Sequence, residues 1–126
     1  NKLTISEHDY FQEIQDMKVS SHLYIKRTGE TIQFVPLNMR AWHAGQSSYK
    51  GIKDCNNYSI GIELEGTDCD VYSNEQYESL IKVSRLIIKK YPEINKDCVV
   101  GHSDISPGRK TDPGDKFEWR RYLDAL

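Results

Sequence analysis

The chain has 126 residues and a net charge of −2 at pH 7, with 37% hydrophobic and 29% charged residues. This length suffices for one domain with a modest core, and we expect a single domain over residues 1–126. The charges are interspersed, which excludes the basic face typical of nucleic-acid binders. No apolar run is long enough to cross a membrane. The sequence therefore indicates neither a nucleic-acid nor a membrane partner, and it leaves the oligomeric state open.

The three cysteines, Cys55, Cys69 and Cys98, are scattered along the chain. An odd number of widely spaced cysteines makes a poor disulfide framework. We expect free thiols in a reducing compartment, and hence a cytoplasmic protein. One disulfide with one free cysteine stays open as the alternative.

The first half of the chain predicts a helix, a hairpin and a loop. Apolar residues recur at helical spacing over residues 6–17. Residues 22–27 and 32–34 alternate between apolar and polar side chains around Thr28-Gly29, which predicts a β-hairpin. Residues 38–57 have no clear period and predict a long, structured surface loop.

The middle of the chain predicts a strand followed by a helix. Residues 59–65 alternate sharply and predict a strand. Residues 73–91 show apolar residues at helical spacing. Ser73 and Gln76 form a capping box at the start, and Pro92 stops the helix.

The last third predicts a short buried strand at residues 98–100 and a final helix capped by Asp115 with Glu118. The hairpin requires an antiparallel strand pair, whereas strands followed by helices permit parallel neighbours. The order of elements therefore predicts an α/β domain with a mixed central β-sheet flanked by helices, without fixing the strand order.

The segment "GHSDISPGRKTDPG", residues 101–114, concentrates ionisable side chains among turn residues. Its Gly and Pro residues let the loop fold back, so that His102 and Asp112 can meet as zinc ligands. In the structural alternative, His102 caps a strand and Asp112 caps a turn. Lys110 can stabilise an oxyanion, and Arg109 can bind a substrate carboxylate. In the structural alternatives, Lys110 is a solvated surface lysine and Arg109 forms a surface ion pair.

Glu63 is the candidate general base. It shares a strand face with Gly61 and Glu65, and the missing side chain at Gly61 allows a ligand or another backbone to approach. Glu65 competes for the same role, and a solvent-facing Glu63 is the structural alternative. In the loop, Trp42 can stack on a sugar ring or anchor the loop as a buried residue.

Three long stretches then indicate a family: "SSHLYIKRTGETIQFVPLNMRAWHAG", "CNNYSIGIELEGTD" and "GHSDISPGRKTDPG". Together they resemble zinc-dependent N-acetylmuramoyl-L-alanine amidases, whose fold is shared by peptidoglycan recognition proteins. The nearest branch is AmpD, which acts on 1,6-anhydro-muropeptides in bacterial cell-wall recycling. The resemblance implies zinc as cofactor, a muropeptide as substrate, hydrolysis of the bond between muramic acid and L-alanine, and a cytoplasmic location.

The resemblance also implies roles for single residues. His102 and Asp112 match two zinc ligands, and Glu63 rather than Glu65 matches the catalytic carboxylate. Lys110 matches a lysine that stabilises the transition state. Arg109 matches a contact to the stem peptide. Lys18 stands where the family often has a peptide-binding arginine, and lysine keeps the charge but lacks the planar fork.

The family takes its third zinc ligand from a histidine on an early strand. No such strand precedes the predicted first helix, so we expect this strand and its histidine upstream of Asn1, and an N-terminally incomplete amidase domain. The competing hypothesis is a peptidoglycan-binding module that has lost a metal ligand and does not hydrolyse peptidoglycan.

Overall fold

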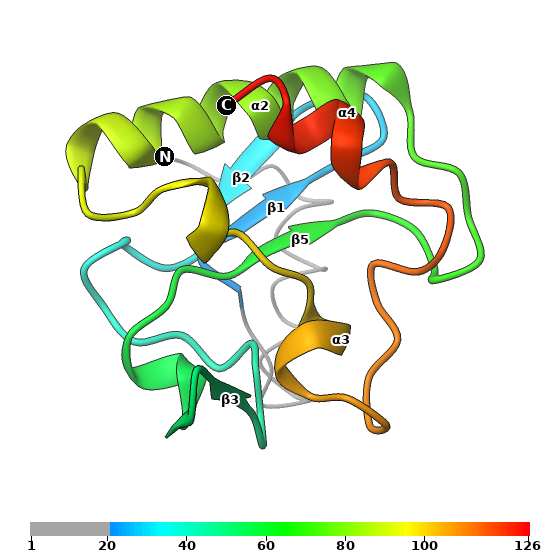
Figure 1. Ribbon diagram of the computed structural model, residues 1–126. Helices are drawn as coiled ribbons and strands as arrows, with labels where there is room; N and C mark the ends of the chain where they lie inside the picture. Colours follow the sequence, from blue (N-terminus) through cyan, green and yellow to red (C-terminus); the bar gives the residue numbers. More distant parts are fainter. Residues whose placement is uncertain (1–20) are drawn as a thin grey trace. The chain divides into compact units, whose positions relative to one another are not determined.

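The computed structural model describes residues 21–126 (Figure 1). The helix predicted over residues 6–17, and Lys18, lie outside the described residues. The elements follow in this order: β1 (Leu23–Ile25), β2 (Thr31–Gln33), β3 (Ser48–Tyr49), β4 (Ile52–Lys53), η1 (Cys55–Asn57), β5 (Ile62–Leu64), α2 (Asn74–Lys90), η2 (Lys96–Cys98), α3 (His102–Ile105) and α4 (Trp119–Leu123).

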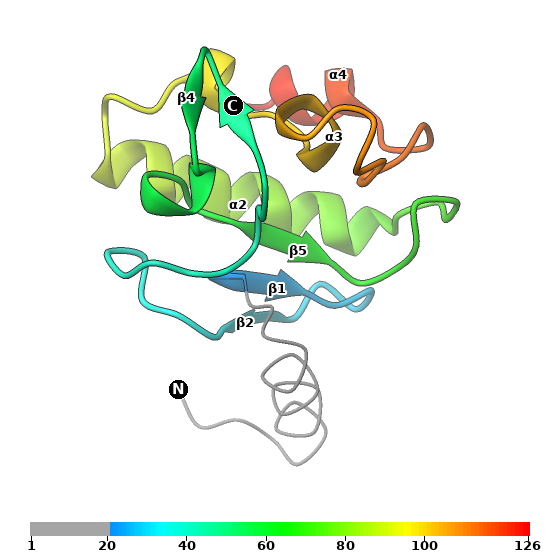
Figure 2. The same ribbon diagram turned by 90° about the horizontal axis from the view of Figure 1, so that it is seen from below.

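The main sheet has the order β2-β1-β5, with β1 in the centre (Figure 2). The predicted hairpin forms β1 and β2. The pairing of β1 with β5 is parallel. Leu23 N donates to Gly61 O at 3.2 Å and Glu65 N donates to Ile25 O at 2.9 Å, so the residue numbers increase in the same direction along both strands. The predicted mixed sheet is therefore confirmed.

The central strand is buried on both of its faces. Leu23, Tyr24 and Ile25 are at most 7% exposed. The alternating pattern predicted one buried face only. The difference follows from the position of β1, since a central strand can be covered on either side whatever its own pattern suggests.

The chain forms two compact units, and the boundary between them runs through β1 and β5. Among the described residues, the first unit holds residues 21–24 and 31–63, and the second holds residues 25–30 and 64–126. Each of the two strands therefore contributes residues to both units.

In the first unit, the long loop of residues 38–57 contains more structure than the sequence indicated. β3 and β4 form a small antiparallel hairpin within it. The buried Asn56 side chain accepts hydrogen bonds from His43 N at 3.0 Å and Ala44 N at 2.8 Å. One amide oxygen thus fixes the backbone just after Trp42.

In the second unit, α2 begins as predicted. Ser73 is the N-cap, and both hydrogen bonds of the capping box with Gln76 are present. The Gln76 side chain is fully buried and donates to Glu65 O at 2.9 Å and to Ile25 O at 3.3 Å. The first turn of α2 is thereby attached to the ends of β1 and β5.

The final helix lies beside α2 (Figure 1). Tyr122 is 4% exposed, and its hydroxyl lies 2.5 Å from Ser84 Oγ. The expected cap was wrong: Glu118 stands at the N-cap of α4 and makes no side-chain capping bond, and Asp115 lies three residues earlier.

The buried strand predicted at residues 98–100 was also wrong. Cys98 ends the 3-10 helix η2, and it is exposed. Asn95 explains the difference, because its side chain accepts a hydrogen bond from Asp97 N at 2.9 Å and so favours a turn over an extended strand.

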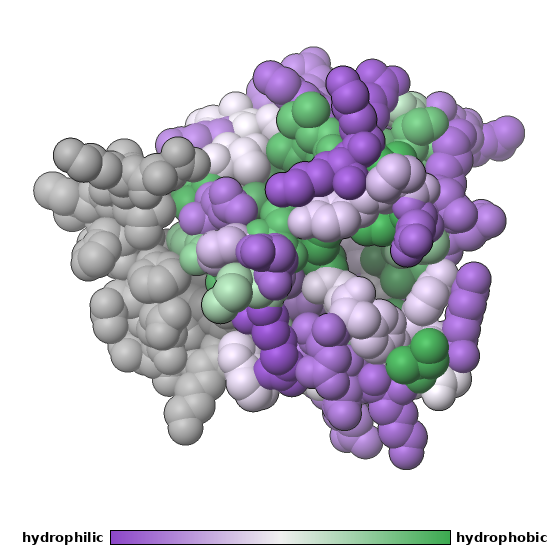
Figure 3. Space-filling model, turned by 90° about the vertical axis from the view of Figure 1, so that its left-hand side faces the viewer, coloured by the Kyte–Doolittle hydropathy of each residue, from purple (hydrophilic) through white to green (hydrophobic). Residues whose placement is uncertain are grey.

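One face of the described residues is covered mainly by hydrophilic side chains, with apolar ones in small patches between them (Figure 3). Across residues 21–126, none of the helices combines the length and the hydropathy that crossing a membrane demands.

Candidate metal and catalytic site

The segment of residues 101–114 folds back on itself within the second unit. His102 is the first residue of α3, and Gly101 N donates to Asp104 Oδ2 at 2.7 Å, which fixes the start of that helix. The returning part of the loop is attached by Ser103 N, which donates to Asp112 O at 3.0 Å. This backbone bond places the side chain of Asp112 beside His102.

His102 Nδ1 and Asp112 Oδ2 are 3.2 Å apart, with side chains 17% and 48% exposed. A charge-assisted hydrogen bond is shorter, at about 2.7–2.9 Å. Two atoms that ligate one tetrahedral zinc at its usual bond lengths lie about 3.3 Å apart. The pair therefore fits the chemistry and the spacing of two zinc ligands. Within residues 21–126, the side chains of His, Cys, Asp and Glu form no cluster of three or more that could hold a metal ion.

Asp112 is held in its ionised form. The hydrogen bond with His102 lowers the pKa of the Asp112 carboxyl more than burial raises it, and the charge of Lys110 lowers it further. The carboxylate is the form that binds a cation.

Lys110 and Arg109 stand on the turn that precedes Asp112. Both backbone amides donate to Ser106 O, and the Arg109 guanidinium donates to Ser106 Oγ at 3.1 Å. Lys110 also lines an open pocket of about 530 Å³ together with residues that include Ser103, Pro113, Phe117 and Trp119. The turn thus presents two cations within three residues of Asp112.

The loop between β5 and α2 also holds the Asp112 segment. Tyr72 is buried, and its hydroxyl donates to Pro113 O at 2.8 Å. The Thr111 hydroxyl donates to Asp68 Oδ2, and Gly114 packs against the Asp68 backbone. Sequence reasoning missed Tyr72 and Asp68, because no local pattern links positions about 40 residues apart.

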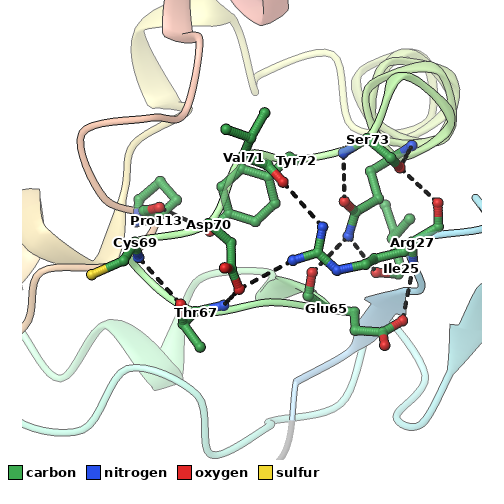
Figure 4. Close-up of polar contacts among 11 residues, drawn as sticks. Ile25, Arg27, Glu65, Thr67, Cys69, Asp70, Val71, Tyr72, Ser73 and Pro113 are labelled. Carbon is green, nitrogen blue, oxygen red and sulfur yellow. Dashed lines mark hydrogen bonds and ion pairs between the residues drawn. The ribbon is translucent and has the colours of Figure 1, made fainter.

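Arg27 in turn holds this loop between β5 and α2 (Figure 4). Its guanidinium lies 3.1 Å from Asp70 Oδ2 and donates to Val71 O at 3.0 Å. Its backbone N donates to Glu65 Oε1 at 2.9 Å. Glu65, the competitor for the role of general base, therefore has a structural partner for its carboxylate.

Glu63 belongs to the first unit, where it is exposed on β5. The close approach expected at Gly61 is made by the His43 ring, which occupies the space that a Cβ of residue 61 would fill. The small residue is thus required by packing within the protein, and neither a ligand nor another backbone takes this space.

Trp42, in the loop of the first unit, is 60% exposed. Arg40 Cζ lies 3.9 Å from the centroid of the Trp42 ring, and Arg40 Nε donates to Asn57 Oδ1 at 2.8 Å. The alternative of a buried anchor is therefore wrong. An indole held by a cation at the surface is suited to stacking on a ligand.

Comparison with known proteins identifies the family. Residues 1–115 match the family Amidase_2, described as N-acetylmuramoyl-L-alanine amidase. The chain is 50% identical over 125 residues to 1,6-anhydro-N-acetylmuramyl-L-alanine amidase AmpD of Haemophilus influenzae, covering 99% of this chain and 68% of that protein. It is 52% identical over 115 residues to the Escherichia coli enzyme of the same name, covering 91% of this chain and 62% of that protein.

Solved structures agree with this relationship. A crystal structure of an AmpD derivative matches with a TM-score of 0.85 at 47% identity, covering 98% of this chain and 69% of the other. A complex of the E. coli amidase AmiD with anhydro-N-acetylmuramic acid-L-Ala-D-gamma-Glu-L-Lys matches with a TM-score of 0.86 at 32% identity, covering 94% of this chain and 52% of the other. The fold, the order of the motifs and these matches agree, and the chain belongs to the N-acetylmuramoyl-L-alanine amidase family.

Proposed function

We propose that this protein hydrolyses the amide bond between the lactyl group of anhydro-N-acetylmuramic acid and L-alanine in muropeptides, as a zinc enzyme of cytoplasmic cell-wall recycling. The observation that supports this most is the 3.2 Å separation of His102 Nδ1 and Asp112 Oδ2 in a chain of the amidase family. The substrate class is suggested by the muropeptide fragment bound to the related amidase AmiD.

His102 and Asp112 are the residues that would hold the zinc ion. When bound, zinc supplies Lewis-acid activation of a water molecule and of the scissile carbonyl. A third protein ligand is usual for a catalytic zinc. The family resemblance assigns that role to a histidine on an early strand.

Glu63 accepts a proton from the attacking water. As the new C–O bond forms, the carbonyl oxygen becomes negative, and the Lys110 ammonium stabilises that charge. Glu63 then transfers its proton to the alanine nitrogen as the C–N bond breaks. The products are the anhydro-sugar acid and a free peptide amine. Arg109 and Lys18 bind carboxylates of the peptide, and Trp42 stacks on the sugar.

The test is cleavage of an anhydro-muramyl tripeptide by the intact protein, followed by chromatography of the released peptide. We expect Glu63→Gln and Lys110→Ala to fold normally and to lose about a hundredfold to a thousandfold in kcat, because the first removes the general base and the second removes a cation that stabilises the oxyanion. Glu78→Gln and Lys82→Ala, which remove the same charges from exposed positions on α2, are the matched controls. Near-normal turnover by a zinc-loaded Glu63→Gln protein would contradict the role of Glu63.

Metal analysis separates this enzyme from the binding module. An enzyme is expected to hold one zinc per chain, and a chelator should abolish cleavage. An intact protein that binds the tripeptide, holds no zinc and releases no peptide would instead support the binding module.

A further inference from the structure

His22 is fully buried and uses both ring nitrogens. Nε2 lies 2.7 Å from Met39 O, and Nδ1 lies 3.0 Å from Gly61 N. A carbonyl oxygen can only accept a hydrogen bond, and a backbone N–H can only donate one. These two partners are therefore satisfied together by one tautomer of the imidazole, with the proton on Nε2.

The two partners are close in sequence to candidate site residues of the first unit. Met39 precedes Trp42 by three residues in the loop. Gly61 precedes Glu63 by two residues, so the two positions share a strand face. The His22 backbone adds a bond from its own N to Gly61 O at 2.9 Å. One side chain thus links the strand of Glu63 to the loop of Trp42.

His43 fills the space around this link. Its ring meets the His22 ring edge to face with centroids 5.6 Å apart, and it packs against Gly61. Ser59 Oγ lies 3.3 Å from His43 Nε2. Because these groups are packed together, a change at His22 leaves a buried polar group unsatisfied unless the strand or the loop moves.

We propose that His22 is a positioning residue, which orients Glu63 through Gly61 and Trp42 through Met39 by means of its Nε2–H tautomer. This inference rests on the proposed function for the roles of Glu63 and Trp42. His22 touches neither substrate nor reacting atoms, and its effect is to fix where the two side chains stand before substrate binds.

Two substitutions separate the two hydrogen bonds. His22→Gln can keep a donor for Met39 O but loses the acceptor for Gly61 N, so we expect kcat to fall about 10- to 100-fold with KM nearly unchanged. His22→Asn can keep the acceptor for Gly61 N but loses the donor for Met39 O, so we expect KM to rise about tenfold with a smaller change in kcat. The measurement is steady-state cleavage of the anhydro-muramyl tripeptide.

Ile87→Ala is the control for a loss of stability alone, because Ile87 is buried in α2 and belongs to the second unit. At equal folded fraction, it should leave both kinetic constants unchanged. If both His22 variants behave like Ile87→Ala, the positioning role is overturned.

The ¹⁵N chemical shifts of the His22 ring in the unmodified chain give a test that needs no activity and no variant. We expect a protonated Nε2 and an unprotonated Nδ1, and the opposite tautomer would overturn the proposal. An intact, zinc-loaded protein that does not cleave the tripeptide would refute the proposed function, whereas the ring shifts would still decide the state of His22.

Discussion

Gly114 shows how a single position can set the geometry of a site. Its φ is +88°, a backbone conformation that residues with a Cβ rarely adopt, and a Cβ there would overlap the carbonyl oxygen of Asp68. The residue follows Asp112 by two positions. The absence of a side chain at Gly114 therefore lets the Asp112 segment lie directly on the neighbouring loop.

We predict that Gly114→Ala lowers the free energy of unfolding by about 3 kcal/mol or more, because the left-handed conformation and a backbone clash add together. Gly108→Ala is the matched control. Its φ is +79°, but no atom lies within 4 Å of the position that a Cβ would take. Only the conformational cost of about 1–2 kcal/mol applies there. If urea unfolding shows that Gly114→Ala and Gly108→Ala lose the same free energy of unfolding, the contact with Asp68 is unimportant.

Among the helices, a buried hydrogen bond between two side chains joins α2 to α4. Ser84 Oγ and Tyr122 OH lie 2.5 Å apart, and both residues are at most 5% exposed. Burial raises the pKa of the Tyr122 phenol, and the hydrogen bond with Ser84 opposes that shift only in part. Each hydroxyl satisfies the other in a region from which water is excluded.

We predict that Ser84→Ala and Tyr122→Phe each lower the free energy of unfolding by about 1–3 kcal/mol, since each leaves the other hydroxyl unsatisfied. The double variant should lose clearly less than the sum, and urea unfolding of the four proteins measures this coupling. Ser84→Ala combined with Tyr72→Phe is the control pair, for which additive losses are expected. Additivity in both pairs would rule out the contact as a stabilising unit.

For the stability of the folded chain as a whole, the ion pair between Arg27 and Asp70 predicts a pH dependence. Hydrogen bonds from the Thr67 backbone and side chain, and then the Arg27 charge, lower the pKa of the Asp70 carboxyl from its usual 3.8. A carboxyl whose pKa is lower in the folded state stabilises the fold above its unfolded pKa, and that stabilisation is lost as pH falls through the folded value.

We therefore expect Asp70→Asn to be less stable than the unmodified chain at pH 7, and the difference in thermal midpoint to shrink as pH falls below about 4. Asp124→Asn is the control, because the Asp124 side chain is 73% exposed and lies 3.7 Å from Arg120 Nε. The difference between the thermal midpoint of Asp124→Asn and that of the unmodified chain should not change with pH. A difference at Asp70 that does not change with pH would contradict this account.

Elements that depend on neighbouring residues could be predicted from the sequence. The hairpin around Thr28-Gly29 and the capping box of α2 arise from residues a few positions apart, and both are present. The prediction of a strand at residues 98–100 was wrong, because the Asn95 side chain accepts a hydrogen bond that favours a turn over the extended strand that the apolar pattern indicated. The family could be recognised because three motifs appear in the same order along the chain.

What the sequence could establish without coordinates is the family, the mixed sheet and the candidate residues His102, Asp112, Lys110, Arg109 and Glu63. The tertiary structure decided which residues meet that lie far apart in the sequence. Glu65 meets Arg27 across 38 positions, His22 meets Gly61 across 39, and Tyr72 meets Pro113 across 41. Short-range patterns cannot indicate such contacts, because they depend on how the sheet and loops pack, and packing is a property of the folded chain.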